Sequence, residues 1–204
     1  MFRKILVVVM IVMLSGIIVY ADFGFMVKSD RTLSPQPDQA LIVFMRPKPS
    51  FGKAIWTDDY GQAISVFDVS GDSTEFIGIL YKNTKICYDV DPGEYTFMVV
   101  GAAADFMKAK VTAGKTYYVV LSPRLGVWKA RFSFRPLRQF DLTSSDFSKW
   151  NSKTVLLENT PDSKEWFVEK ASEIATKKET YFSEWSKLSQ EELDSMSLNI
   201  EDGI

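Results

Sequence analysis

The sequence contains no histidine and only one cysteine among its 204 residues. Without histidine, the chain lacks the side chain that most often acts as a general base and as a metal ligand, which excludes His-dependent catalysis. A single cysteine cannot form an intramolecular disulfide. Cys87 lies in the apolar run Ile86-Cys87-Tyr88, a setting typical of an inert core thiol rather than of a nucleophile.

The net charge is also small, since the chain has 24 Lys and Arg and 26 Asp and Glu. The balance gives no case for a nucleic-acid partner. The charges are unevenly placed: residues 40–141 carry 13 basic and 10 acidic side chains, whereas residues 142–204 carry 7 and 13. This asymmetry predicts that the acidic tail contacts the basic part of the chain, with a simple solvated acidic face as the alternative.

Recognisable catalytic motifs are missing as well. The sequence has no nucleophile motif, no Gly-rich phosphate loop and no cluster with metal-ligand spacing. Paired carboxylates are the only acid–base chemistry that the remaining residues supply easily, and sequence gives no separation between them. We therefore predict a protein that is not an enzyme, with no catalytic residues, no cofactor and no metal site.

What the chain does have begins with an apolar segment. Arg3 and Lys4 precede an apolar run over residues 5–21, and Ala21 supplies a small residue before Asp22, as at a signal-peptide cleavage site. The alternative is an uncleaved membrane anchor, because the run would span roughly 26 Å as a helix, which is marginal for a bilayer. Both interpretations place the rest of the chain outside the cytoplasm, either periplasmic or secreted, or tethered to the inner membrane by residues 5–21.

A proline-containing stretch without periodicity, residues 22–39, is predicted to be a linker. Short apolar or alternating segments separated by Gly and Pro turns then fill residues 40–141, which predicts a mainly β domain, an antiparallel β-sandwich (immunoglobulin/prealbumin-like) of about seven to eight strands. The expected strands are residues 40–46, 63–69, 75–81, 85–90, 94–100, 106–111, 115–122 and 128–135.

The stretch Val90–Gly101 is the clearest architectural signal. Pro92 and Gly93 favour a tight turn, and the following residues alternate so that Tyr95, Phe97 and Val99 share one face. Residues 96, 98 and 100 share the other face. Because both faces are largely apolar, the pattern predicts an interior strand.

Three motifs carry a family resemblance: Pro92-Gly93-Glu94-Tyr95, the run from Ala113 to Val119 (AGKTYYV), and Gly126-Val127-Trp128. Residues 40–140 resemble the bacterial domain family of unknown function number 2846, often found in lipoproteins. They are more loosely similar to the surface modules named for a Pro-Glu-Gly-Ala motif. The resemblance implies an envelope-associated β-sandwich with no assigned activity. This chain lacks a lipid-acceptor Cys after its apolar segment.

Residues 142–160 are expected to be a connector, and residues 161–204 a helical C-terminal extension. Thr160 and Pro161 are typical of a helix start, and Ser189 with Glu192 forms a capping box that begins a second helix. An apolar stripe along the first helix packs either on its own sandwich or on an envelope protein partner. The candidate residues for that contact are Phe167, Ile174, Phe182 and Trp185.

Two further groups of side chains are candidate sites. Trp56, Asp58, Asp59 and Tyr60 share a loop whose aromatic faces and carboxylates suit a glycan or Ca²⁺. The second group is a basic row facing an anionic partner or the acidic tail, with a solvated strand face as the plain alternative. Its members are Arg124, Lys129, Arg131, Arg135 and Arg138.

The sequence thus predicts an exported, non-catalytic, envelope-associated β-sandwich protein with a structural or protein-interaction role. The alternative is an extracytoplasmic ligand-binding module that uses the Trp56–Tyr60 loop. No nucleic-acid partner is expected, and contact with the membrane is expected only through the N-terminal segment, if it is not cleaved.

Overall fold

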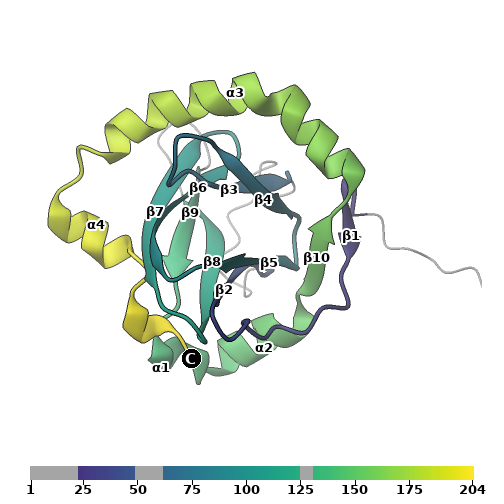
Figure 1. The fold of residues 1–204 in the computed structure, drawn as a ribbon, viewed down its shortest axis with the longest axis vertical. Coiled ribbons are helices and arrows are strands. Elements are labelled where there is room, and N and C mark those ends of the chain that lie inside the picture. Colours follow the sequence, from purple (N-terminus) through teal and green to yellow (C-terminus); the bar gives the residue numbers. More distant parts are fainter. Residues whose placement is uncertain (1–22, 49–61, 125–130) are drawn as a thin grey trace, which may run out of the picture.

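The computed structural model describes residues 23–48, 62–124 and 131–204. Within these residues the chain forms nine strands, then two helices, a tenth strand and the remaining helices (Figure 1). The strands are β1 (Met26–Lys28), β2 (Ala40–Arg46), β3 (Ile64–Asp68), β4 (Glu75–Leu80), β5 (Thr84–Val90), β6 (Gly93–Val100), β7 (Ala104–Val111), β8 (Thr116–Arg124), β9 (Arg131–Pro136) and β10 (Val155–Asn159). The helices are α1 (Gln139–Leu142), α2 (Ser145–Lys153), α3 (Pro161–Trp185), α4 (Gln190–Met196) and the 3₁₀ helix η2 (Ile200–Asp202).

The strands form two sheets, so the mainly β class with a helical C-terminal part is confirmed. The six-stranded sheet has the order β1-β10-β5-β2-β8-β9, and the four-stranded sheet has the order β4-β3-β6-β7. The eight strands expected within residues 40–141 overlap with β2 to β9, and β1 and β10 bring the total among the described residues to ten. The expected antiparallel pairing holds for most neighbouring strands but not for all. β10 pairs with β5 in parallel, and β2 pairs with β8 in parallel, because the chain leaves the larger sheet between these strands and returns to it in the same direction.

The main core lies between the two sheets. Strand β2 shows why the larger sheet is central, since all seven of its residues are buried. Ile42 and Phe44 point into the main core, and the Phe44 ring lies 5.2 Å from that of Phe97 on β6. The intervening residues of β2, Leu41 and Val43, pack on the other face in a cluster that includes α2. A continuous apolar run buried on both faces is therefore confirmed.

Strand β6 is an interior strand, as its sequence predicts, with β3 and β7 on either side. Tyr95, Phe97 and Val99 face the main core, whereas Met98 and Val100 face a second apolar cluster. That second cluster lies beneath α3. The alternation predicted from the sequence is therefore present: one face of β6 packs in the main core, and the other face packs in the second cluster beneath α3.

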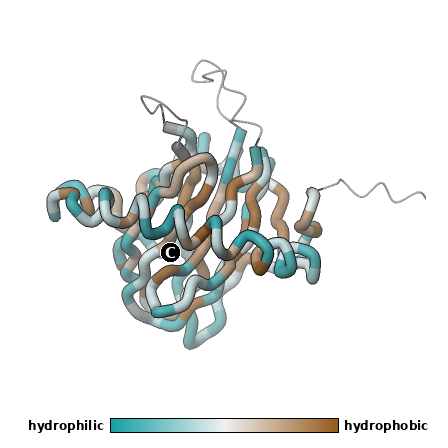
Figure 2. The backbone as a smooth tube through the Cα atoms, turned by 90° about the horizontal axis from the view of Figure 1, so that it is seen from above, coloured by the Kyte–Doolittle hydropathy of each residue, from teal (hydrophilic) through white to brown (hydrophobic). Residues whose placement is uncertain are grey.

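Helix α3 begins at Pro161 with Thr160 as its N-cap and curves over the strands (Figure 1). Seen from above, its tube alternates in hydropathy while the strands behind it are mostly hydrophobic (Figure 2). Ile174 and Trp185 are buried against the four-stranded sheet. Helix α4 begins after the N-cap Ser189, and the predicted capping box with Glu192 is present. Most of the energy that holds such a helix comes from this apolar packing.

Two segments that lacked periodicity are structured. Residues 22–39 were expected to be a linker, but β1 in this segment pairs with β10 through the register Met26–Asn159. Residues 142–160 were expected to be a connector, but they contain α2 and β10, and Phe147 of α2 is buried. β1 has only three residues, and the sequence of β10, Val-Leu-Leu-Glu-Asn, does not alternate between apolar and polar residues.

Candidate functional site

Several of the predicted site residues lie outside the described residues. These are the loop residues Trp56, Asp58, Asp59 and Tyr60, the basic residue Lys129, and the cleavage-site residues Ala21 and Asp22. The glycan or Ca²⁺ site and the cleavage site therefore stay predictions. Arg124 and Arg131 pair through their backbones at the end of β8 and β9, but their side chains belong to the part that is not described.

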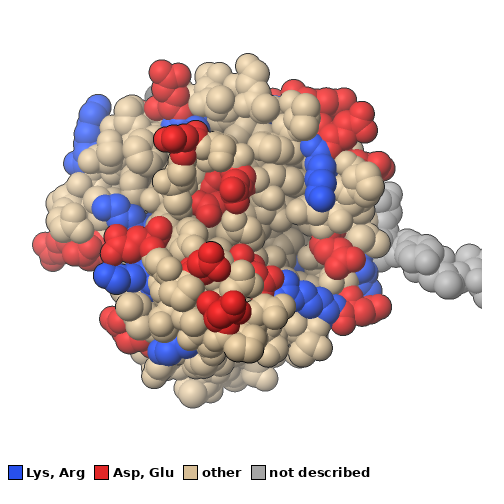
Figure 3. All heavy atoms as spheres, viewed as in Figure 1, with Lys and Arg blue, Asp and Glu red and all other residues tan. Residues whose placement is uncertain are grey.

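Arg135, a described member of the basic row, is occupied within the protein. Its guanidinium lies 2.8 Å from the carboxylate of Asp141 and 5.8 Å from the centre of the Trp150 ring. Figure 3 shows basic and acidic side chains interspersed over one face of the molecule. Among the described residues on that face, no broad basic patch stands ready for an anionic partner.

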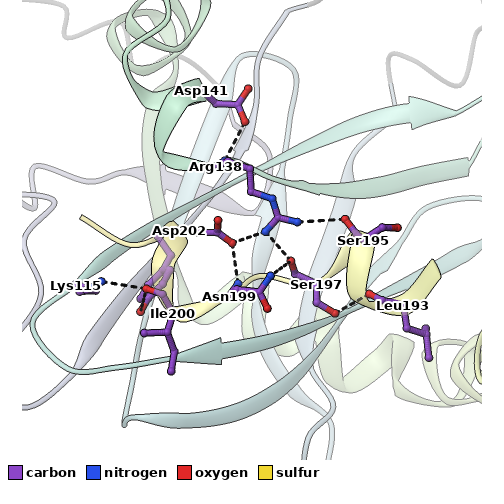
Figure 4. A network of polar contacts seen from close by, with 10 residues as sticks. Lys115, Arg138, Asp141, Leu193, Ser195, Ser197, Asn199, Ile200 and Asp202 are labelled. Carbon is purple, nitrogen blue, oxygen red and sulfur yellow. Dashed lines mark hydrogen bonds and ion pairs between the residues drawn. The ribbon is translucent and has the colours of Figure 1, made fainter. Parts of the chain in front are cut away.

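Arg138 belongs to a network of polar contacts near the end of the chain (Figure 4). Its guanidinium is paired with the carboxylate of Asp202 and donates to the carbonyl oxygens of Ser197 at 3.0 Å and Ser195 at 3.2 Å. Asp202 is only 3% exposed and also accepts from the backbone N–H of Asn199 at 2.8 Å. A cation at the C-terminal end of α4 satisfies carbonyl groups that the helix leaves unpaired.

Residues 197–204, which we call the strap, extend this attachment along the sheet edges. Leu198 lies beside Ala109 of β7 as a parallel bridge. Its N–H donates to Lys108 at 2.9 Å, and its carbonyl accepts from Lys110 at 2.8 Å. Ile204 exchanges two further backbone hydrogen bonds with the first residue of β8. The predicted contact between the acidic tail and the basic part of the chain is therefore confirmed, through Arg138 and Asp202.

The helix residues proposed for a partner pack on the protein's own sheet. Ile174 and Trp185 are buried in the second apolar cluster, and the Phe167 ring lies 5.8 Å from the Phe67 ring of β3. Phe182 is partly exposed but contacts Phe106 at 5.2 Å. Of the two interpretations of the stripe, packing in cis is the one that the structure shows.

Tyrosines and carboxylates meet at one end of the main core. The Tyr88 hydroxyl donates to Glu75 at 2.9 Å and lies 3.5 Å from Asp68. Burial, reinforced by the hydrogen bond to Glu75 and by neighbouring negative charge, raises the pKa of Tyr88 well above its usual value. A phenol held neutral in this way is a hydrogen-bond donor rather than a base. Within residues 23–48, 62–124 and 131–204, no three His, Cys, Asp or Glu side chains are grouped to hold a metal ion.

Cys87 on β5 is half-buried. Burial is the main influence on its thiol and raises the pKa above the ordinary value. Because the thiolate is the reactive form, the structure agrees with the interpretation of Cys87 as an unreactive thiol.

An apolar hollow of about 290 Å³ lies where the described chain begins. The residues around it come from four places: Gly24 and Phe25 before β1, Ala63 to Ser65 at the start of β3, Ile79 and Tyr81 at the end of β4, and Trp166 on α3. None of them is acidic or basic. At this size the hollow is at the lower limit of small-molecule sites and suits one apolar group.

Local contacts fix the rim of the hollow. Gly24 has φ +59, and a Cβ there would lie 2.5 Å from the Tyr81 hydroxyl, so only glycine fits this turn. The backbone N–H of Phe25 donates to the same hydroxyl at 3.2 Å, and its carbonyl accepts from Thr160 at 2.6 Å. The Phe25 and Trp166 rings lie 6.1 Å apart. The sequence did not point to Phe25, because it lies in the segment expected to be a linker.

Comparison with known proteins adds no identification. No family model matches the chain, and a search of curated proteins gives no match. Across the described ranges, no helix is both long and apolar enough to cross a membrane.

Proposed function

We propose that this chain is an exported, non-catalytic, envelope-associated protein with a structural or interaction role, built on a β-sandwich of the immunoglobulin/prealbumin type. The resemblance to the lipoprotein-associated family of unknown function and the signal-like residues 1–21 support its place outside the cytoplasm. The two sheets that face each other over one core support the sandwich architecture.

The observation that carries the proposal is the apolar hollow. Its lining offers aromatic and aliphatic surface without an acid, a base or a thiol, so it suits the docking of an apolar group and not the making or breaking of bonds. Phe25, at its rim, is 42% exposed. Exposed apolar surface beside a preformed hollow is typical of an interaction site.

The way the chain uses its polar side chains points in the same direction. Arg135 and Arg138 each bind a carboxylate of the same chain, and the strap pairs with β7 and β8. These contacts stabilise the outer strands and cover a sheet edge. Such an arrangement suits a rigid scaffold that presents a fixed surface.

The test has two arms in a bacterial host that expresses the full chain. Protease added outside spheroplasts degrades the protein if it is exported; protection until the inner membrane is lysed would contradict export. In the second arm, p-benzoylphenylalanine replaces Ala63 at the hollow, with replacement of the exposed Gly71, which has open space around it, as the control. We expect an adduct with an envelope component at position 63 only. Equal or absent adducts at both positions would contradict an interaction role for the hollow.

A further inference from the structure

The described chain is attached to the sheets from its first residue. Phe23 forms a bridge with Met26 and packs against the main core, so the linker expected over residues 22–39 is not there to separate residues 1–21 from the domain. Gly24, which lines the hollow, is three residues beyond Ala21. Three residues span at most about 10 Å when fully extended.

This short connection limits where the hollow can be. If residues 5–21 remain in a bilayer, Gly24 must lie within about 10 Å, and Phe25 within about 14 Å, of the point where the chain leaves the apolar layer. A membrane interface extends over a comparable depth, since headgroup regions add roughly 5 to 8 Å on each side of the hydrocarbon core. The rim of the hollow would therefore lie in the interface or directly beside it.

The residues at the rim are those that favour such a position. Phe25 is exposed, the Trp166 ring lies 6.1 Å from the Phe25 ring, and the Tyr81 hydroxyl accepts from the backbone N–H of Phe25. Tryptophan and tyrosine concentrate at membrane interfaces because one part of the ring is apolar and another forms hydrogen bonds. The hollow has no charged lining, so the attraction would come from apolar contact and not from the charge of the lipids.

A retained anchor also accounts for the marginal length of residues 5–21. A short apolar segment is accommodated when flanking aromatic residues hold the interface close to it. Phe23 follows the segment in the sequence, and Phe25 two residues later lies beside Trp166 in the fold.

We infer that residues 5–21 are retained as an anchor and that the rim formed by Phe25, Tyr81 and Trp166 rests in the interface of the bilayer that holds them. The inference rests on the proposed export, and it names lipid as the component that occupies the hollow. The partner is the bilayer surface, irrespective of headgroup charge.

Tryptophan quenching tests this contact with the full chain in phosphatidylcholine vesicles. Bromine atoms on the acyl carbons nearest the headgroup quench only tryptophans that touch them. We compare Trp166→Phe with Trp185→Phe, because both residues belong to α3 and are separated by roughly 28 Å along the helix. We expect Trp166→Phe to lose most of the quenchable emission and Trp185→Phe, whose ring is buried, to lose little.

A second variant guards against an effect of misfolding. Phe25→Trp in the Trp166→Phe background should restore the quenching, because it returns a tryptophan to the same rim. Quenching that persists in Trp166→Phe, or that Phe25→Trp does not restore, overturns the inference.

The outcomes separate this inference from the proposed function. A mature chain that begins at Asp22 overturns the anchor but agrees with export. A chain that stays in the membrane while Trp166 escapes quenching overturns the docking alone, and a protein adduct at position 63 in cells would assign the hollow to a protein instead of lipid. A chain that is never exported contradicts both proposals.

Discussion

Substituting Arg138 should cost more stability than substituting Asp202, its partner in the ion pair. Asp202 is 3% exposed, whereas the Arg138 side chain is 29% exposed. Arg138→Met leaves a buried carboxylate without its counter-charge and removes the donors to Ser195 and Ser197. Breaking a buried ion pair costs about 3 to 5 kcal/mol, and water that reaches the partly exposed arginine site favours the lower value, about 3 kcal/mol.

Asp202→Ala removes the other partner at a smaller cost. The guanidinium of Arg138 remains partly exposed to water and keeps its two carbonyl acceptors. The loss is then close to that of one hydrogen bond to a charged group, about 1.5 to 2 kcal/mol, because water can solvate the exposed part of the guanidinium. The double variant should cost less than the two single variants together, because both changes remove the same interaction.

Hydrogen exchange measured by mass spectrometry reads this difference locally. Exchange in residues 190–204 should accelerate by roughly 150-fold in Arg138→Met, since about 1.4 kcal/mol corresponds to a factor of ten. Peptides from β2, which is fully buried, serve as the internal control for global unfolding. Exchange unchanged in Arg138→Met, or a larger effect in Asp202→Ala, would refute the reasoning that Arg138 holds the strap.

Three other predictions concern packing and pH. Ile174 is 4% exposed, so Ile174→Ala should lower the free energy of unfolding by about 2 to 4 kcal/mol. Val168 on the same helix is 72% exposed, so Val168→Ala should change it by less than about 0.5 kcal/mol. Similar urea midpoints for the two variants would contradict the packing of α3 on its own sheet. Gly203→Ala should lower the free energy of unfolding by about 1 to 3 kcal/mol, because its Cβ would meet an aromatic ring of β8 at 2.6 Å. Gly71→Ala, with nothing nearby, is the matched control and should show almost no thermal shift. Folding raises the pKa of Tyr88, so the folded state holds the phenol proton more tightly than the unfolded state does. The stability that this gives is present below about pH 10 and is lost as the pH rises further. In urea titrations, Tyr88→Phe should show a shallower decline of stability at alkaline pH, and an identical decline would argue against this role of Tyr88.

The parts of the fold that sequence predicted are those with a sustained period. β2 and β6 were identified because their runs of seven and eight residues show which faces are apolar. α3 was identified from its stripe and from Thr160 and Pro161 at its start. In each case, local spacing alone decides which side chains are buried.

The parts that sequence missed depend on contacts between distant segments. β1 has three residues and is stabilised by its pairing with β10, which lies more than a hundred residues later in the chain. The parallel pairing of β2 with β8 likewise has no local signal. The hollow was missed for the same reason, because Phe25 and Trp166 come together only when β1 and α3 have docked.

Charge predicted that the acidic tail contacts the basic part of the chain but not where. Composition showed the excess of acidic residues after position 142, yet most of these carboxylates lie on exposed helical faces. Only the structure distinguishes Asp202, which is buried, from exposed neighbours such as Glu201. Burial, not charge count, decides which carboxylate stabilises the fold.

The strap also sets the order in which the molecule can be completed during synthesis. β7 and the first residue of β8 are synthesised well before Leu198 and Ile204, the residues that pair with them. The nascent chain therefore cannot finish its fold before residue 204 has been synthesised. For the export proposed above, this delay is useful, because the contacts of the strap that complete the fold are made late.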